Sequence, residues 1–244
     1  MRRLLGLLCL MVVGCTADVE NNKRNNGVTG PSNTMATVAG VDCEDNLCVL
    51  TGTITEDYTM TANNAYLLRG GVFIGDDTSE NTLTIEPGTI IYGETNSDGM
   101  LVVRRNAKIM AEGTAEAPIV MTSSKNEGSR TRGDWGGVII NGNAPINSCG
   151  KKGFCEAFGE GGTGFYGGTN PDDSSGVLKY VRIEFAGTLI SPDNELNGLA
   201  LQGVGANTTL DYIQVHMNAD DGVEFFGGTA DIKHLVVSGV GDDA

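Results

Sequence analysis

Two acidic turns near the end of the chain offer a candidate metal site. Asp220 and Asp221 stand in an Ala-Asp-Asp-Gly turn, and Asp242 and Asp243 follow 22 residues later in a Gly-Asp-Asp-Ala turn. Two carboxylates about 5 Å apart repel by roughly 3 kcal/mol at an effective dielectric near 20, and a bridging cation removes that repulsion. Calcium accepts carboxylate, amide and backbone oxygens, so we expect a calcium site at Asn218, Asp220, Asp221, Asp242 and Asp243. The alternative is a solvated acidic turn.

A second group of residues could perform acid–base chemistry. Arg182 and Glu184 alternate onto one face of a strand, and a 32-residue offset places His216 beside Glu184. Carboxylates and basic groups along such a face serve polysaccharide lyases and hydrolases. These three residues are the best catalytic candidates in the sequence, although they do not make a complete constellation. The alternative is an exposed polar ladder without a catalytic role.

Elements that repeat along the chain must position both groups. The segment LDYIQVHM, from Leu210, is followed 22 residues later by IKHLVVSG, and Leu178 opens the same frame 32 residues earlier. An 18-residue offset relates Leu83 to Leu101 and Ile85 to Val103. Regular offsets between short strands indicate stacked coils. The sequence therefore predicts an all-β fold, a parallel β-helix; an immunoglobulin-like sandwich, the alternative, does not explain the offsets.

The repeat frame predicts which side chains form the core. Apolar positions that alternate along the strands should face inward in two ladders, while the polar positions between them face outward. The inward ladders are Val181, Ile213 and Leu235, and Ile183, Val215 and Val237.

The first 37 residues have the composition of an export signal and a tether. Arg2 and Arg3 precede a short apolar run, and the segment ending at Cys15 resembles the lipobox of bacterial lipoproteins. That resemblance implies cleavage after residue 14 and acylation of Cys15, which anchors a protein without a spanning helix. We therefore expect a signal peptide at 1–14, a lipidated Cys15 with a flexible tether at 15–37, and a β-helix domain at 38–244. A chance cysteine after an ordinary signal peptide is the alternative.

Four further cysteines form two local pairs. An oxidising compartment outside the cytoplasm favours two disulfides, each closing a short loop worth at most roughly 2 kcal/mol. Zinc is the alternative, but no histidine stands near either pair. The expected pairs are Cys43 with Cys48, and Cys149 with Cys155.

Charge limits the partners. The formal net charge is −15 at pH 7, which makes nucleic acid a poor partner. We expect contact with a membrane through the lipid anchor only, and carbohydrate or another envelope protein as partners. No cofactor is required, apart from the calcium considered above.

Three motifs resemble a known family. They are GDWGGVIINGNAPIN from Gly133, LKYVRIEFAG from Leu178, and the run from Asn197 to Ala244. Together they resemble large β-helical surface lipoproteins of Gram-negative marine and gliding bacteria, often mislabelled as multidrug transporters. The resemblance implies a right-handed parallel β-helix in the cell envelope. Members of that family continue well beyond this point, so we expect the β-helix to be incomplete at its C-terminus.

These observations favour a lipid-anchored cell-envelope protein, in the outer membrane with its domain in the periplasm or on the cell surface. It would present a rigid acidic β-helix for structural, adhesive or ligand-binding roles. The alternatives are a polysaccharide-active β-helix enzyme, either lyase or hydrolase, and a calcium-dependent binding module.

Overall fold

The computed structural model describes residues 38–147, 155–192 and 194–244. The chain divides into two compact units, Met1–Met35 and Ala36–Ala244, and the second contains all the described residues. The expected signal peptide, Cys15 and most of the tether lie outside the described residues. Within the described ranges, no helix is long and apolar enough to cross a bilayer.

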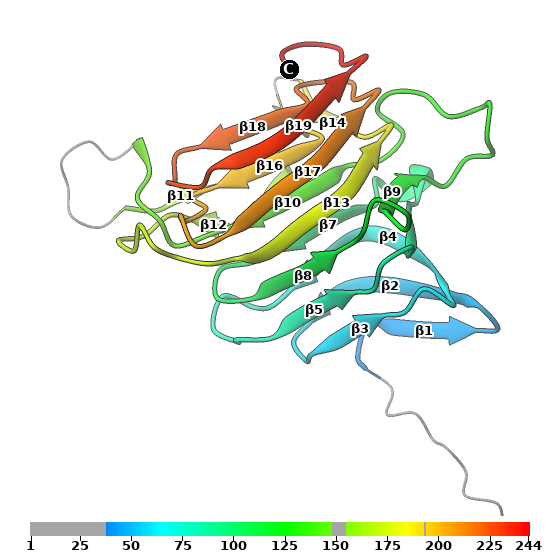
Figure 1. Cartoon of the computed structure of the whole chain (residues 1–244), viewed down its shortest axis with the longest axis horizontal. Helices are drawn as coiled ribbons and strands as arrows, with labels where there is room; N and C mark the ends of the chain where they lie inside the picture. Colours follow the sequence, from blue (N-terminus) through cyan, green and yellow to red (C-terminus); the bar gives the residue numbers. More distant parts are fainter. Residues whose placement is uncertain (1–37, 148–154, 193) are drawn as a thin grey trace, which may run out of the picture. The chain divides into compact units, whose positions relative to one another are not determined.

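Parallel strands stack coil upon coil, as the repeats predict. Alternating apolar residues make each strand, and each strand pairs in parallel with the equivalent strand of the next coil. Figure 1 shows the coils in chain order, from β1–β3 in blue at one end to β17–β19 in orange and red at the other. The fold is a parallel β-helix, and the predicted fold class is confirmed.

Three strand rows make up the coils. The first row contains the second half of β4 (Ala65–Ile74), then β7 (Met100–Val103), β10 (Gly137–Asn141), β16 (Leu199–Gln202) and β18 (Val223–Phe226). The second contains β3 (Tyr58–Met60), β5 (Thr82–Ile85), β8 (Lys108–Glu112), and the first halves of β13 (Gly176–Glu184), β17 (Thr209–His216) and β19 (Ile232–Ser238). The third contains the first half of β4, β6 (Ile90–Gly93), β9 (Ile119–Ser123) and the second halves of β13, β17 and β19.

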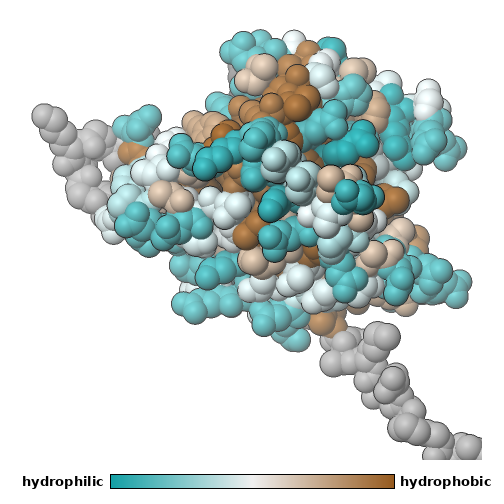
Figure 2. Space-filling model, viewed as in Figure 1, coloured by the Kyte–Doolittle hydropathy of each residue, from teal (hydrophilic) through white to brown (hydrophobic). Residues whose placement is uncertain are grey.

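The register of the last coils agrees with the repeat frame. Val181 pairs with Ile213 and Ile213 with Leu235, while Ile183, Val215 and Val237 form the next ladder. The members from β13 and β17 are almost completely buried, but Leu235 is 36 % exposed because β19 belongs to the last coil. Figure 2 shows hydrophobic atoms gathered over the end of the stack that carries β19.

The 18-residue offset in the first half was wrong as a coil repeat. Leu83 pairs with Ile109, 26 residues later, and Leu101 pairs with Val72 and Val138. The offset compared strands of two different rows, because every row of a β-helix carries the same apolar alternation.

Two insertions leave the coils beside the first row. One carries β11 (Ala157–Phe158), the 3₁₀ turn η3 (Glu160–Gly162) and β12 (Phe165–Tyr166); the other is the hairpin of β14 (Leu189–Ser191) and β15 (Asn194–Glu195). Leu196, which follows β15, packs with Met100, Val102, Ile139 and Ala200 in an apolar cluster on the outer face of this row. A further 3₁₀ turn, η1 (Thr95–Ser97), lies between β6 and β7.

A hairpin and a disulfide form the N-terminal end of the domain. β1 (Val41–Glu44) pairs antiparallel with β2 (Leu47–Ile54), and Cys43 lies opposite Cys48. Their sulfur atoms are 2.04 Å apart, which confirms the first predicted disulfide. In the second predicted pair, Cys149 lies outside the described residues.

Candidate functional site

The structure brings Arg182, Glu184 and His216 into one outward row of the third strand face, but it does not leave Glu184 free. Glu184 is only 7 % exposed. Its Oε1 lies 2.5 Å from Nη2 of Arg182, and its Oε2 accepts a hydrogen bond from Thr122 Oγ1 at 3.2 Å. The Glu184 carboxylate is therefore held in an ion pair beneath the surface.

Neighbours also occupy the other groups of this row. His216 pairs with Glu184 in the strand register, and its Nδ1 lies 2.9 Å from Ser238 Oγ. The buried Trp135 donates its indole N–H to the backbone oxygen of Glu184 at 2.8 Å. These contacts tie three coils together, and they account for the row as packing and hydrogen bonding.

The acidic turns do converge. Carboxylate oxygens of Asp220, Asp221 and Asp242 all lie within 4.8 Å of one another. None of the ion pairs between described residues includes any of the three. Asp243 meets the cluster through its backbone, because its N–H donates to Asp221 Oδ1 at 2.8 Å. The 22-residue register thus stacks one acidic turn on the next.

The fifth candidate, Asn218, is fully buried beside the turn. Its Nδ2 donates to the backbone oxygen of Asp221 at 2.6 Å, which fixes the turn. Its Oδ1 is buried without a hydrogen-bond partner. An orphaned buried oxygen is costly, and an amide oxygen is also a calcium ligand. The donor set of this turn, carboxylates and an amide, therefore fits a hard cation.

Electrostatics at the turn are those of uncompensated acids. Burial, followed by the charges of Asp221, Glu195 and Asp242, raises the pKa of Asp220. A depression of about 630 Å³ opens here, lined by residues that include Glu195, Asp220 and Asp242, with Arg132 at its side. A cation bound there would relieve the repulsion that raises this pKa.

Sequence reasoning missed three acids beside the turn. Glu160 and Glu195 come from the two insertions, which have no place in the repeat frame, and Glu224 belongs to β18. The signal available for Glu224 was its position in the outward alternation of Val223–Phe226, next to the acidic turn. Nothing in the sequence placed Glu160 near it.

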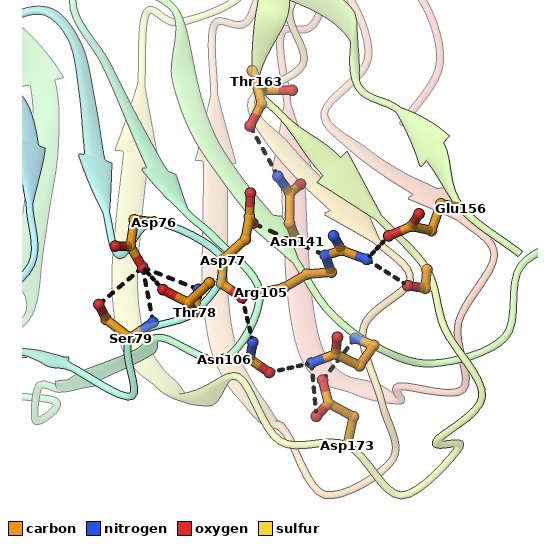
Figure 3. Close-up of polar contacts among 12 residues, drawn as sticks. Asp76, Asp77, Thr78, Ser79, Arg105, Asn106, Asn141, Glu156, Thr163 and Asp173 are labelled. Carbon is orange, nitrogen blue, oxygen red and sulfur yellow. Dashed lines mark hydrogen bonds and ion pairs between the residues drawn. The ribbon is translucent and has the colours of Figure 1, made fainter.

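A polar network at the opposite corner of the coils has a structural role. Arg105 forms ion pairs with Asp77 and Glu156, and Asn143 joins Asn106 to Asp173 (Figure 3). Hydrogen bonds from the side chain and backbone of Thr78, and from those of Ser79, lower the pKa of Asp76 well below its usual range. The network fastens the first-row corners to the 157–166 insertion.

Comparison with known proteins gives one match. A family model described as a pectate-lyase-like β-helix domain matches residues 52–244, most of the chain. No curated protein and no solved structure was found to match it.

Proposed function

The chain belongs to the pectate-lyase-like β-helix domain family, and from this premise we propose that it is an exported, lipid-anchored envelope protein whose β-helix presents a calcium-dependent binding surface. The β-helix supplies a rigid scaffold, and Cys15 supplies the anchor. The acidic turns supply the site at which a cation joins the protein to its ligand.

One observation carries this proposal. Three carboxylates meet within 4.8 Å without a protein cation to neutralise them, and the buried Asn218 brings an unpaired amide oxygen to the same turn. A solvated acidic turn would have no need of that buried amide oxygen. The occupation of Glu184 by Arg182 and Thr122 favours binding over catalysis at the row first considered for acid–base chemistry.

Thermal melting of the full chain tests the calcium site. Calcium binds the folded state only, so it should raise the midpoint, and a chelator should reverse the change. Asp221→Asn should abolish the calcium response, since Asp221 both offers a ligand and anchors the turn. Asp231→Asn, at an exposed position outside the cluster, is the matched control and should respond as the wild type does. An equal melting midpoint in calcium and in chelator would disprove the calcium site.

A further inference from the structure

The first strand row carries a second group of acids on its outer face. In β18, Val223 and Phe225 pair with the core residues Leu199 and Leu201, while Glu224 pairs with Ala200. Ala200 belongs to the apolar cluster on the outer face. Strand alternation therefore directs the Glu224 side chain outward, away from the core.

A buried amide holds Glu224. Asn197 is 2 % exposed, and its Nδ2 donates to Glu224 Oε2 at 2.6 Å. Its Oδ1 is buried without a hydrogen-bond partner. A buried side chain is thus aimed at this carboxylate and retains a polar atom for a ligand or a water molecule.

The 157–166 insertion brings Glu160 over the same place. An atom added as Cβ at Gly159 would lie 2.4 Å from Gln202 Oε1, and one at Gly161 would lie 2.9 Å from Leu196 Cδ2. Gln202 and Leu196 flank Ala200 along the chain, so Glu160 crosses above the level of Ala200 and Glu224. A hydrogen bond from Gly161 N to Asn194 Oδ1, 2.9 Å long, ties this turn to the second insertion.

The two carboxylates differ in what surrounds them. Burial, then the charges of Asp220 and Glu195, raise the pKa of Glu160. Burial also raises the pKa of Glu224, but the hydrogen bond from Asn197 opposes that rise. Glu160 is therefore suited to hold a proton and Glu224 to accept one, the division of roles that acid–base catalysis needs.

This pair is separate from the candidate calcium site. Among the described residues, the acids close enough to enclose a metal ion are Asp220, Asp221 and Asp242. Glu160 and Glu224 do not join a third acid within that distance, yet each influences the protonation of Tyr166. Two acids that share a surface without sharing an ion are arranged for proton transfer.

We propose that Glu160 and Glu224 are the general acid and general base of a site that hydrolyses glycosidic bonds in neutral polysaccharides. Glu160 gives its proton to the glycosidic oxygen as the bond from that oxygen to the anomeric carbon breaks. Glu224 takes a proton from water, whose oxygen bonds to the anomeric carbon. The products are two sugar chains with free hydroxyl groups, and solvent returns the proton from Glu224 to Glu160.

The charge around the pair selects the substrate class. Glu195, Asp220 and Asp242 line the adjoining depression with Arg132 as a basic neighbour, so an anionic polymer would meet net repulsion. Apolar rings accompany the acids: Tyr166 contacts Phe226 with 6.1 Å between ring centroids, and the 157–166 insertion exposes Phe158 and Phe165. Ring faces suit the C–H surface of uncharged sugars.

The test is release of reducing ends from neutral xylan, mannan, glucan and galactan by the full chain in the presence of chelator. We expect product from at least one polymer, and about 100-fold or greater loss of kcat in Glu160→Gln and in Glu224→Gln. Glu112→Gln, at an exposed position on β8, is the matched control and should keep full activity. Melting curves establish that each variant is folded; Glu160 is exposed, so its replacement should leave the midpoint unchanged.

The role of Asn197 has its own readout. Asn197→Ala removes the hydrogen bond that favours the charged form of Glu224, so the acidic limb of the pH–rate profile should move to higher pH. Absence of product from all four polymers would overturn the proposal, as would full activity in a folded Glu160→Gln variant. Because the assay contains chelator, either failure leaves the calcium proposal standing, and an unresponsive melt leaves this one standing.

Discussion

Individual acidic side chains near the C-terminal coils are stressed because few cations accompany them. Asp134 provides the contrast. Burial alone would raise its pKa, but hydrogen bonds from Lys125, Ser123 and Thr131 outweigh burial and lower it. Asp220 has no such compensation, and its pKa is raised. The two aspartates show that the partners of a carboxylate, and not its burial alone, decide the direction of the shift.

Removing the Asp220 charge should stabilise the metal-free protein. The pKa of Asp220 is higher in the folded than in the unfolded state, so stability falls as pH rises from about 3.8 through the folded-state value, and the penalty is complete above it. We expect Asp220→Asn to gain about 0.5–1 kcal/mol at neutral pH in chelator, and nothing below about pH 3.8. Urea unfolding at several pH values measures this. A loss of stability at neutral pH would contradict the expectation.

Elements of this fold are joined at corners that demand unusual backbone. Tyr180, Tyr212 and His234 occupy equivalent corners of successive coils with φ of 51°, 51° and 48°. Their rings stack, with centroids 4.4 Å and 4.1 Å apart. The repeat frame placed these residues together on the outer side, and the stacking offsets part of the cost of left-handed backbone.

The corner column allows the stacking and the backbone cost to be separated. Tyr212→Ala should lose two ring contacts, about 1–3 kcal/mol in all, while still requiring left-handed backbone. Tyr212→Asn loses the same contacts but tolerates that conformation better, so it should unfold at a higher denaturant concentration than the alanine variant. Equal midpoints for the two variants would mean that the backbone conformation costs nothing measurable.

Close approach between coils is the other constraint at the element scale. At Gly176, the first residue of β13, φ is +109° and an added Cβ would lie 2.0 Å from the backbone oxygen of Ile109. Gly128 also has positive φ, +79°, but nothing lies within 4 Å of its added Cβ.

The two glycines form a matched pair for chemical denaturation. Gly176→Ala should cost about 3 kcal/mol or more, because backbone strain adds to a clash that rigid strands cannot relieve. Gly128→Ala should cost about 1 kcal/mol, since strain alone is involved. If the two changes cost the same, contact between coils is not the limiting factor.

The whole molecule combines the acidic β-helix with the proposed anchor. We expect Cys15→Ser to abolish lipid attachment, so that the protein moves from the membrane fraction to the soluble fraction of the envelope. Mass spectrometry of the N-terminal peptide checks the modification directly. Cys48→Ser, which breaks the disulfide of the N-terminal hairpin, is the control and should leave the membrane association unchanged. A wild-type protein found soluble and unmodified would rule out the anchor.

The sequence by itself determined the β-helix, the register of its last three coils and the stacking of Asp220 and Asp221 on the next acidic turn, because alternation and a constant offset leave one way to align identical strands. It could not distinguish equivalent rows in the first half, so the 18-residue offset joined Leu83 to the wrong coil.

Only the tertiary structure decided that Glu184 is buried against Arg182, and that two insertions carry Glu160 and Glu195 to the same surface as Glu224. Side-chain pairing and the path of non-repeating loops depend on contacts between distant segments. No periodic pattern records those contacts.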